Sequence, residues 1–332
     1  MSPHRIPISP EGSTTLSFTP VSPLLIRPWS KGRFSVFLRQ GDRFVLYSSQ
    51  GEAFTPELRT KLFERGIKEV YILAGEMQAY EGYLEENLGI LLGDESIPLN
   101  ERSGALYEAS LSVVKDVFTQ KLPKPLTKKG FERVRRLVEA GIQFLGTKES
   151  LKHMARLISQ DYDIFHHSVN VMVLTTFLLQ AEEDMDAARL INCGIGAILH
   201  DIGKARMPKK LLDKRPETLS REETDLLRTH PNLGIALSAD VPLAGEIIHC
   251  ILFHHENEDG SGYPSGLKGP EIPRYVKALS VCNLYDNLTT ATEYRQAKAP
   301  FEALQQIKAR QHVFEPEMIK RLILVLANAE IV

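Results

Sequence analysis

Histidines beside an aspartate are the residues of this chain best suited to chemistry. Eight of its ten histidines lie between His153 and His255. Within that stretch, residues 200–204 read His-Asp-Ile-Gly-Lys and residues 254–256 read His-His-Glu. Neutral imidazole is a common metal ligand, and histidines grouped beside an aspartate are what a hydrolytic site with two metal ions needs. The pattern therefore predicts a metal-dependent hydrolytic site.

Each of these residues also has a simpler interpretation when it is taken alone. A His-Asp pair can cap a helix at the surface, and His230 before Pro231 can be a residue at a helix entry. His167 lies in an apolar helical pattern, where a single histidine is often a core residue with satisfied hydrogen bonds. However, four separate segments each present a histidine next to a helical apolar pattern, and one metal site explains all four together.

The segments that must position the histidines are predicted to be helices, because apolar residues recur at three- and four-residue spacing from about residue 76 onward. Between 256 and 272 the chain has four glycines and two prolines, which predicts a long loop, and long ordered loops are often functional. The predicted helices span 76–92, 99–121, 128–145, 150–160, 164–181, 185–200, 221–228, 231–239, 243–255, 273–291, 300–310 and 315–328.

The chain before residue 76 shows a different pattern. Apolar segments at 34–38 and 44–47 predict a β-hairpin, and residues 70–73 are predicted to be a strand. Thr55 before a proline predicts the start of a helix that ends near Gly66. This small α/β segment contains no His-Asp cluster, no glycine-rich phosphate loop and no pair of cysteines.

The expected fold class is therefore α+β, and a chain of 332 residues suggests more than one domain. We expect a flexible, proline-containing tail at 1–20 and an N-terminal regulatory or interaction domain with a helical linker at 21–147. A large all-helical domain is expected at 148–332, because Gly146 and Thr147 mark a plausible boundary.

Composition and charge narrow the possible partners and the compartment. The net charge is −2, with 40 basic against 42 acidic residues, which argues against broad binding to nucleic acid or to an anionic membrane. The three cysteines lie far apart in apolar surroundings, as reduced buried thiols do. The chain shows neither an apolar signal core nor the roughly 20 apolar residues that span a bilayer. A cytoplasmic protein that does not insert into membranes is expected.

In their order along the chain, these motifs resemble the signature of HD-GYP phosphodiesterases. The resemblance covers about residues 150–332, and a much looser one covers about 20–95. It implies an all-helical HD-superfamily domain with two or three metal ions, usually iron or manganese, that hydrolyses the bacterial messenger cyclic di-GMP. The matching residues are His167-Ser168, the 200–204 run, His230-Pro231-x-x-Gly234, His254-His255-Glu256 and Asp259-Gly260-Ser261-Gly262-Tyr263-Pro264.

The resemblance implies two divalent metal ions that share Asp201. His167 and His200 are expected to bind the first ion together with Asp201. The ligands expected for the second are Asp201, His230, His254 and His255. Asn283 is also expected to be a metal ligand, because it stands where the family usually has a metal-binding aspartate. An asparagine oxygen can coordinate a metal but lacks the negative charge.

The resemblance also implies catalytic and substrate-binding residues. Lys204 is expected to protonate a departing oxygen or to hold a phosphate, and it forms the expected catalytic set with Asp201 and Asp286. Substrate binding is expected from Tyr263 of the loop and from two basic residues. Packing of the tyrosine on the helices and solvation of the two charges are the alternatives. The two basic candidates are Lys214 and Arg295.

Several positions depart from the family pattern. Besides Asn283, Thr292 replaces an arginine suited to gripping a phosphate or a guanine. Asn257 and Glu258 replace a pair that is usually basic and aromatic, and Asp163 stands where some members carry a glutamate for a third metal. Because aspartate is shorter than glutamate, a third metal site is not expected.

Two functional hypotheses remain open at this point. The first is an enzyme, a metal-dependent phosphodiesterase acting on cyclic di-GMP or a related cyclic dinucleotide, with weakened catalysis. The second is a catalytically degenerate, metal-binding signalling module. The complete histidine set and Asp201 favour the enzyme, whereas Asn283 and Thr292 favour the module. In either case the family implies that a signalling protein can dock on the loop around Tyr263.

Overall fold

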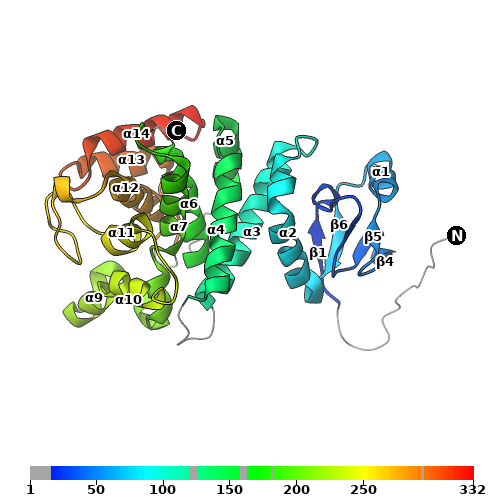
Figure 1. The fold of residues 1–332 in the computed structure, drawn as a ribbon, viewed down its shortest axis with the longest axis horizontal. Coiled ribbons are helices and arrows are strands. Elements are labelled where there is room, and N and C mark those ends of the chain that lie inside the picture. Colours follow the sequence, from blue (N-terminus) through cyan, green and yellow to red (C-terminus); the bar gives the residue numbers. More distant parts are fainter. Residues whose placement is uncertain (1–15, 120–125, 158–162, 181, 293–294) are drawn as a thin grey trace. The chain divides into compact units, whose positions relative to one another are not determined.

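The computed structural model describes residues 16–119, 126–157, 163–180, 182–292 and 295–332. The chain divides into two compact units, Met1–Ala109 and Ser110–Val332. The first combines a small sheet with helices and the second is helical, so the expected α+β class is confirmed (Figure 1). No helix among the described residues is long and apolar enough to cross a membrane.

The first unit is built on a four-stranded antiparallel sheet. Its strands are β1 (Phe18–Val21), β6 (Val70–Leu73), β3 (Val36–Gln40) and β4 (Arg43–Ser48), in that spatial order. The hairpin predicted from the sequence is the β3–β4 pair, and its turn contains Gly41 with φ +61. A second, two-stranded ladder joins β2 (Ser30–Lys31) to β5 (Ala53–Phe54).

Helices complete the first unit. They are α1 (Pro56–Glu64), α2 (Met77–Gly93) and the first part of α3 (Leu99–Thr119), which runs across the unit boundary. The Phe34 ring meets the rings of Tyr80 and Tyr83 edge-on, with centroids 5.3 and 5.4 Å apart. The Tyr83 hydroxyl accepts a hydrogen bond from the Arg27 backbone N–H at 2.7 Å, so α2 is fixed to the chain around β2.

The second unit is a bundle around two buried helices, α6 (Ile164–Leu179) and α7 (Ala187–Leu199). Every residue of α6 from His167 to Leu179 is buried, because α7 and α12 (Arg274–Thr289) pack on it. Further helices of the unit are α4 (Lys128–Phe144), α5 (Lys148–Leu157), α8 (Lys209–Leu212), α9 (Arg221–Leu227), α10 (His230–Leu237), α11 (Gly245–Phe253), α13 (Pro300–Ala309) and α14 (Pro316–Asn328).

The boundary between the compact units lies between Ala109 and Ser110, whereas the sequence suggested one near residue 147. α4 packs on α7, and a Cβ atom added at Gly194 of α7 would lie 2.7 Å from the Val138 side chain. The helical unit therefore begins near Ser110, and residues 146–147 form a turn between α4 and α5. Near the N-terminus, residues 18–20 of the expected 1–20 tail belong to strand β1. Residues 1–15 lie outside the described part. A regulatory role for the first unit stays a prediction.

Candidate metal centre

Asp201 stands at the end of α7, where the backbone changes from α-helix to the short 3-10 helix η3 (Ile202–Arg206). Gly203 lets η3 lie directly on the start of α10, because a Cβ at this position would be 1.9 Å from the His230 carbonyl oxygen. This close approach brings His230 to Asp201, with Nε2 3.2 Å from Oδ1.

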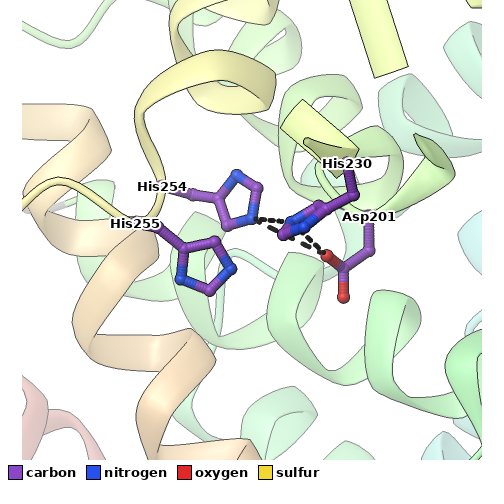
Figure 2. A group of neighbouring side chains, drawn as sticks. All are labelled: Asp201, His230, His254 and His255. Carbon is purple, nitrogen blue, oxygen red and sulfur yellow. Dashed lines mark hydrogen bonds and ion pairs between the residues drawn. The ribbon is translucent and has the colours of Figure 1, made fainter. Parts of the chain in front are cut away.

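The first group of candidate ligands gathers around Asp201 from three elements (Figure 2). His230 begins α10, and His254 and His255 follow the end of α11. One side-chain atom of each of these four residues lies within 4.8 Å of the others. The Nε2 atoms of His230 and His254 are 3.0 Å apart. The structure therefore brings together residues that are distant in the sequence.

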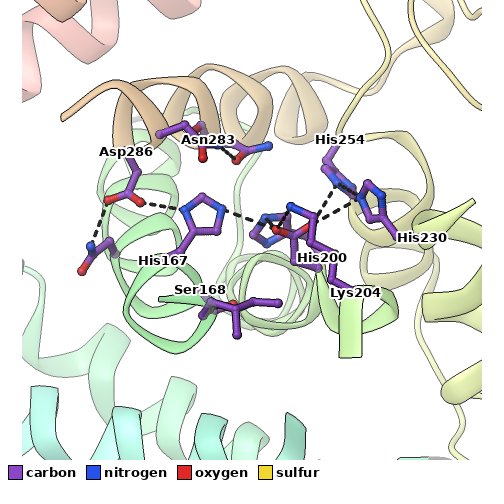
Figure 3. A network of polar contacts seen from close by, with 12 residues as sticks. His167, Ser168, His200, Lys204, His230, His254, Asn283 and Asp286 are labelled. Carbon is purple, nitrogen blue, oxygen red and sulfur yellow. Dashed lines mark hydrogen bonds and ion pairs between the residues drawn. The ribbon is translucent and has the colours of Figure 1, made fainter. Parts of the chain in front are cut away.

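A second group lies on the other side of the same aspartate and consists of Asp201, His167 and His200. His167 projects from α6, and its Nε2 is 3.6 Å from Asp201 Oδ2, while His200 Nε2 is 3.4 Å from the same oxygen (Figure 3). All three side chains are buried. Asp201 thus belongs to both groups, as expected for a carboxylate that bridges two metal ions.

Backbone carbonyls set the orientation of three of these imidazole rings. His200 Nδ1 is 2.7 Å from the Ala197 oxygen, and His230 Nδ1 is 2.8 Å from the Leu227 oxygen. His254 Nδ1 is 3.0 Å from the oxygen of Ile251. A carbonyl only accepts hydrogen bonds, so each Nδ1 carries a proton and each ring directs its Nε2 atom into the centre.

These lone pairs fit a metal ion. The buried His200 Nε2 and Asp201 Oδ1 atoms have no hydrogen-bond partner in the described part of the chain. The Nε2 atoms of His230 and His254 lie 3.0 Å apart, and a cation between them would accept both lone pairs. The donor set of imidazoles and carboxylate suits iron, manganese and zinc alike.

The electrostatics of the centre keep its ligands in the form that binds metal. Burial alone would raise the pKa of Asp201, but the Lys204 ammonium and the neighbouring imidazoles outweigh it and hold that pKa well below its ordinary value. Burial lowers the pKa of His254 to about 3 and also lowers that of His200. An ionised aspartate and neutral histidines are the protonation states that coordinate a metal.

Asp286 lies behind His167 and not between the two groups. Its Oδ2 is 2.7 Å from His167 Nδ1, and its Oδ1 accepts a hydrogen bond from Asn170 Nδ2 at 2.9 Å (Figure 3). Both of its oxygens are engaged with neighbours, and the catalytic role expected for Asp286 stays a prediction. These contacts are those of a residue that positions His167, and Asn170 was not anticipated because amides on buried helices carry no spacing signal.

Lys204 and Tyr263 lie beside the centre as expected. Lys204 Nζ donates to Asp201 Oδ2 at 2.6 Å. The Tyr263 ring stacks on the His255 ring with centroids 4.6 Å apart, and the Arg228 guanidinium lies 5.3 Å from the Tyr263 ring centroid. Tyr263 therefore packs one face against a candidate ligand, and Arg228 was not identified from the sequence.

The loop that carries Tyr263 is folded tightly back on the end of α11. The Tyr263 backbone N–H donates to the His255 oxygen at 3.2 Å, and a Cβ at Gly262 would lie 2.5 Å from that same oxygen. The buried Glu256 carboxylate accepts from the backbone N–H groups of Ser265 at 2.7 Å and Leu267 at 2.9 Å. Glu256, which was expected only as part of a motif, thus holds this loop from the inside.

Asn283 lies on α12 at the wall of a cavity of about 420 Å³ beside the centre. Its Oδ1 accepts a hydrogen bond from Asn287 Nδ2 at 2.8 Å. The same cavity is lined by His254 and His255, so Asn283 faces the space next to the first group of ligands. Its coordination of a metal stays a prediction.

Three further residues singled out in the sequence as possible substrate or metal ligands contact other parts of the protein instead. Lys214 forms an exposed ion pair with Glu223. The Arg295 guanidinium donates to the carbonyl oxygens of Asn287 and Thr290 near the end of α12. Asp163 caps the N-terminus of α6 by accepting from the backbone N–H groups of residues 165 and 166, both at 2.8 Å. These contacts give no support to substrate binding by Lys214 or Arg295, or to a third metal at Asp163.

Comparison with known proteins agrees with this geometry. A family model described as HD domain matches residues 173–318. The matched residues lie within the helical unit. The resemblance to HD-GYP proteins is also confirmed, because curated relatives of this HD domain are named cyclic di-GMP phosphodiesterases.

Two relatives and one solved structure illustrate the similarity. A cyclic di-GMP phosphodiesterase of Pseudomonas aeruginosa is 30% identical over 186 residues, which are 56% of this chain and 44% of that protein. The cyclic di-GMP phosphodiesterase response regulator RpfG of Xanthomonas campestris is 28% identical over 180 residues, 53% of this chain and 41% of that protein. The chain thus spans less than half the length of these relatives.

An HDG"Y"P protein from Bdellovibrio bacteriovorus has a similar fold, with a TM-score of 0.65 and 21% identity. The similarity covers 94% of this chain and all of that one.

Proposed function

We propose that this protein is a metal-dependent phosphodiesterase that hydrolyses cyclic di-GMP or a related cyclic dinucleotide. The observation that carries the proposal is the position of Asp201, whose two carboxylate oxygens face two separate groups of histidines. A hydrolytic centre with two metal ions needs such a shared carboxylate. The names of the curated relatives supply the substrate class.

The proposed cofactors are two divalent ions, iron or manganese. His167, His200 and Asp201 would hold one, and Asp201, His230, His254 and His255 would hold the other, with Asn283 adjacent. When bound, two such ions lower the pKa of water and neutralise charge on a phosphodiester. Buried donors with fixed tautomers keep this geometry without reorganisation.

The remaining residues would act on the substrate directly. Lys204, whose ammonium touches Asp201, is placed to give a proton to the departing 3′ oxygen or to hold a phosphate oxygen. Tyr263, whose ring stacks on that of His255, would contact the substrate from the loop. Docking of a signalling protein on this loop and a cytoplasmic location stay predictions.

The proposal is tested by hydrolysis of cyclic di-GMP after anaerobic loading with Fe²⁺ or Mn²⁺, with product followed by chromatography. Asp201→Ala should abolish turnover, because it removes the ligand common to both groups. Asp225→Ala, which changes an exposed aspartate on α9, is the matched control. Metal-loaded protein that turns over cyclic di-GMP and 3′3′-cGAMP no faster than Asp201→Ala would refute the proposal.

A further inference from the structure

The cavity beside the metal centre has two unlike walls. One wall contains His254 and His255 of the centre together with Asn283 of α12. The other wall is the turn between α13 and α14, which contributes Arg310 and His312. A ligand in this cavity would therefore contact the metal centre and a permanent positive charge at the same time.

The turn that carries Arg310 is anchored to the loop beside the centre. The Val313 N–H donates to the Arg310 oxygen at 2.9 Å, and the Glu258 N–H donates to the Val313 oxygen, also at 2.9 Å. Glu258 is held in turn by an ion pair with Lys277 at 2.9 Å. The backbone of Arg310 is thus fixed with respect to the residues that follow His255.

The charge of the cavity suits an anion. None of the described residues that line it carries a carboxylate. Within the described part of the chain, the exposed Arg310 side chain has neither a hydrogen bond nor an ion pair. Arg295, by contrast, is occupied by the carbonyl oxygens at the end of α12. Of these two guanidinium groups, only that of Arg310 is available to a ligand in the cavity.

We infer that Arg310 binds the phosphate of a cyclic dinucleotide that the metal centre does not hold. This inference rests on the proposed function. A cyclic dinucleotide has two phosphodiester groups, and the planar guanidinium fork matches two oxygens of one phosphate. His312 lines the same wall, but its charge depends on pH near neutrality, so the permanent charge is that of Arg310.

The test compares a substrate that has two phosphodiester groups with one that has a single group. Cyclic di-GMP and bis(p-nitrophenyl) phosphate are assayed on metal-loaded wild type, Arg310→Ala and Arg310→Lys. Lys308→Ala removes an exposed cation two residues earlier, outside the cavity lining, and is the matched control. Metal content is measured for every variant.

Arg310→Ala should raise KM for cyclic di-GMP about tenfold, equivalent to ~1.4 kcal/mol, with kcat within about twofold. Its hydrolysis of bis(p-nitrophenyl) phosphate and its metal content should match the wild type. The KM of Arg310→Lys for cyclic di-GMP should lie between those of the wild type and Arg310→Ala, because lysine keeps the positive charge but lacks the planar guanidinium fork.

Unchanged cyclic di-GMP constants in Arg310→Ala, with an active wild type, overturn this inference and leave the proposed function standing. An equal loss on both substrates also overturns it, because the residue would then act on the centre itself. A wild type that neither binds nor hydrolyses a cyclic dinucleotide overturns the proposed function and this inference together.

Discussion

The Nε2 atoms of His230 and His254 face each other at 3.0 Å inside the helical unit. Each ring uses its Nδ1 proton on a backbone carbonyl, so two lone pairs meet in a buried space. A single cation satisfies both, and the carboxylate of Asp201 lies 3.2 and 3.6 Å from the same two nitrogens. A cation held by these three side chains would bind only the folded chain, so metal binding and stability should be coupled.

Metal binding should therefore raise the unfolding temperature. Metal at about 100 times its Kd adds ~2.7 kcal/mol to the free energy of unfolding, because it binds only the folded state. Calorimetry before and after chelation measures the effect. Asp201→Ala should lose most of this gain and Asp225→Ala none. An Asp201→Ala variant that gains as much as the wild type would show that the metal binds elsewhere.

Removing the carboxylate behind His167 should weaken metal binding without removing a ligand. Asp286→Ala leaves His167 Nδ1 without its partner at 2.7 Å, and loss of such a supporting group typically costs 10- to 100-fold in metal affinity. Asp286→Asn retains an acceptor oxygen and should cost less. Competitive titration with a metal-binding dye measures the affinities. Equal affinities in wild type and both variants would contradict a positioning role.

Adding one methyl group at Gly203 should disturb the centre from a distance. The new Cβ would lie 1.9 Å from the His230 oxygen, so η3 and α10 must separate. We expect Gly203→Ala to lose about 2 kcal/mol of stability and part of its metal content. Gly245→Ala is the control, since a Cβ there meets nothing within 4 Å. Denaturant unfolding and metal analysis check both, and a stable, fully loaded Gly203→Ala protein would be the contrary result.

The stability of the metal-free protein should fall in mild acid. Burial lowers the pKa of His254 from 6.5 to about 3, so the unfolded chain takes up a proton at a pH where the folded chain does not. The contribution is fully present above about pH 6.5 and is lost progressively as the pH falls towards 3. Urea midpoints between pH 7.5 and 4.5 measure it. In His254→Gln the urea midpoint should fall less steeply with decreasing pH than in the wild type. An unchanged pH dependence would disprove the assignment of this effect to His254.

Catalysis by the natural sequence should be weak, and two substitutions should strengthen it. Asn283→Asp adds a negative charge beside His254 and His255, and Asn287 can still donate to the new carboxylate. Thr292→Arg adds a guanidinium for a phosphate, a contact typically equivalent to about 10- to 150-fold in rate. Turnover of cyclic di-GMP by the double variant should exceed that of the wild type. Robust wild-type turnover would contradict this prediction.

The helices were predictable from local pattern, and the two histidine groups were implied by the resemblance to a known family. The expected helix at 128–145 and the observed α4 differ by one residue at the end. The two groups of histidines lie around one aspartate, Asp201. Three strands, β1, β2 and β5, were missed. β2 and β5 have two residues each, which are too few to show a period, and most of β1 lies in the segment expected to be a proline-containing tail. The supporting role of Asp286 was missed because it depends on packing between helices that are 119 residues apart along the chain.

The position of Arg310 beside the metal centre could not be predicted from the sequence either. Its neighbours in the sequence indicate only the exposed end of a helix, and nothing local connects it to His254. The connection is made by the Glu258–Val313 hydrogen bond, which is a tertiary contact.

The source of ring orientation divides the candidate ligands into two kinds. In the first kind, a backbone carbonyl three residues earlier orients the imidazole ring, so the orientation depends only on local structure. This kind comprises His200, His230 and His254. His167 takes its orientation from α12, and this depends on the packing of α12 on α6. As the bundle loosens on heating, the ion beside His167 should therefore leave first, and the protein should pass through a form that holds a single metal before it unfolds.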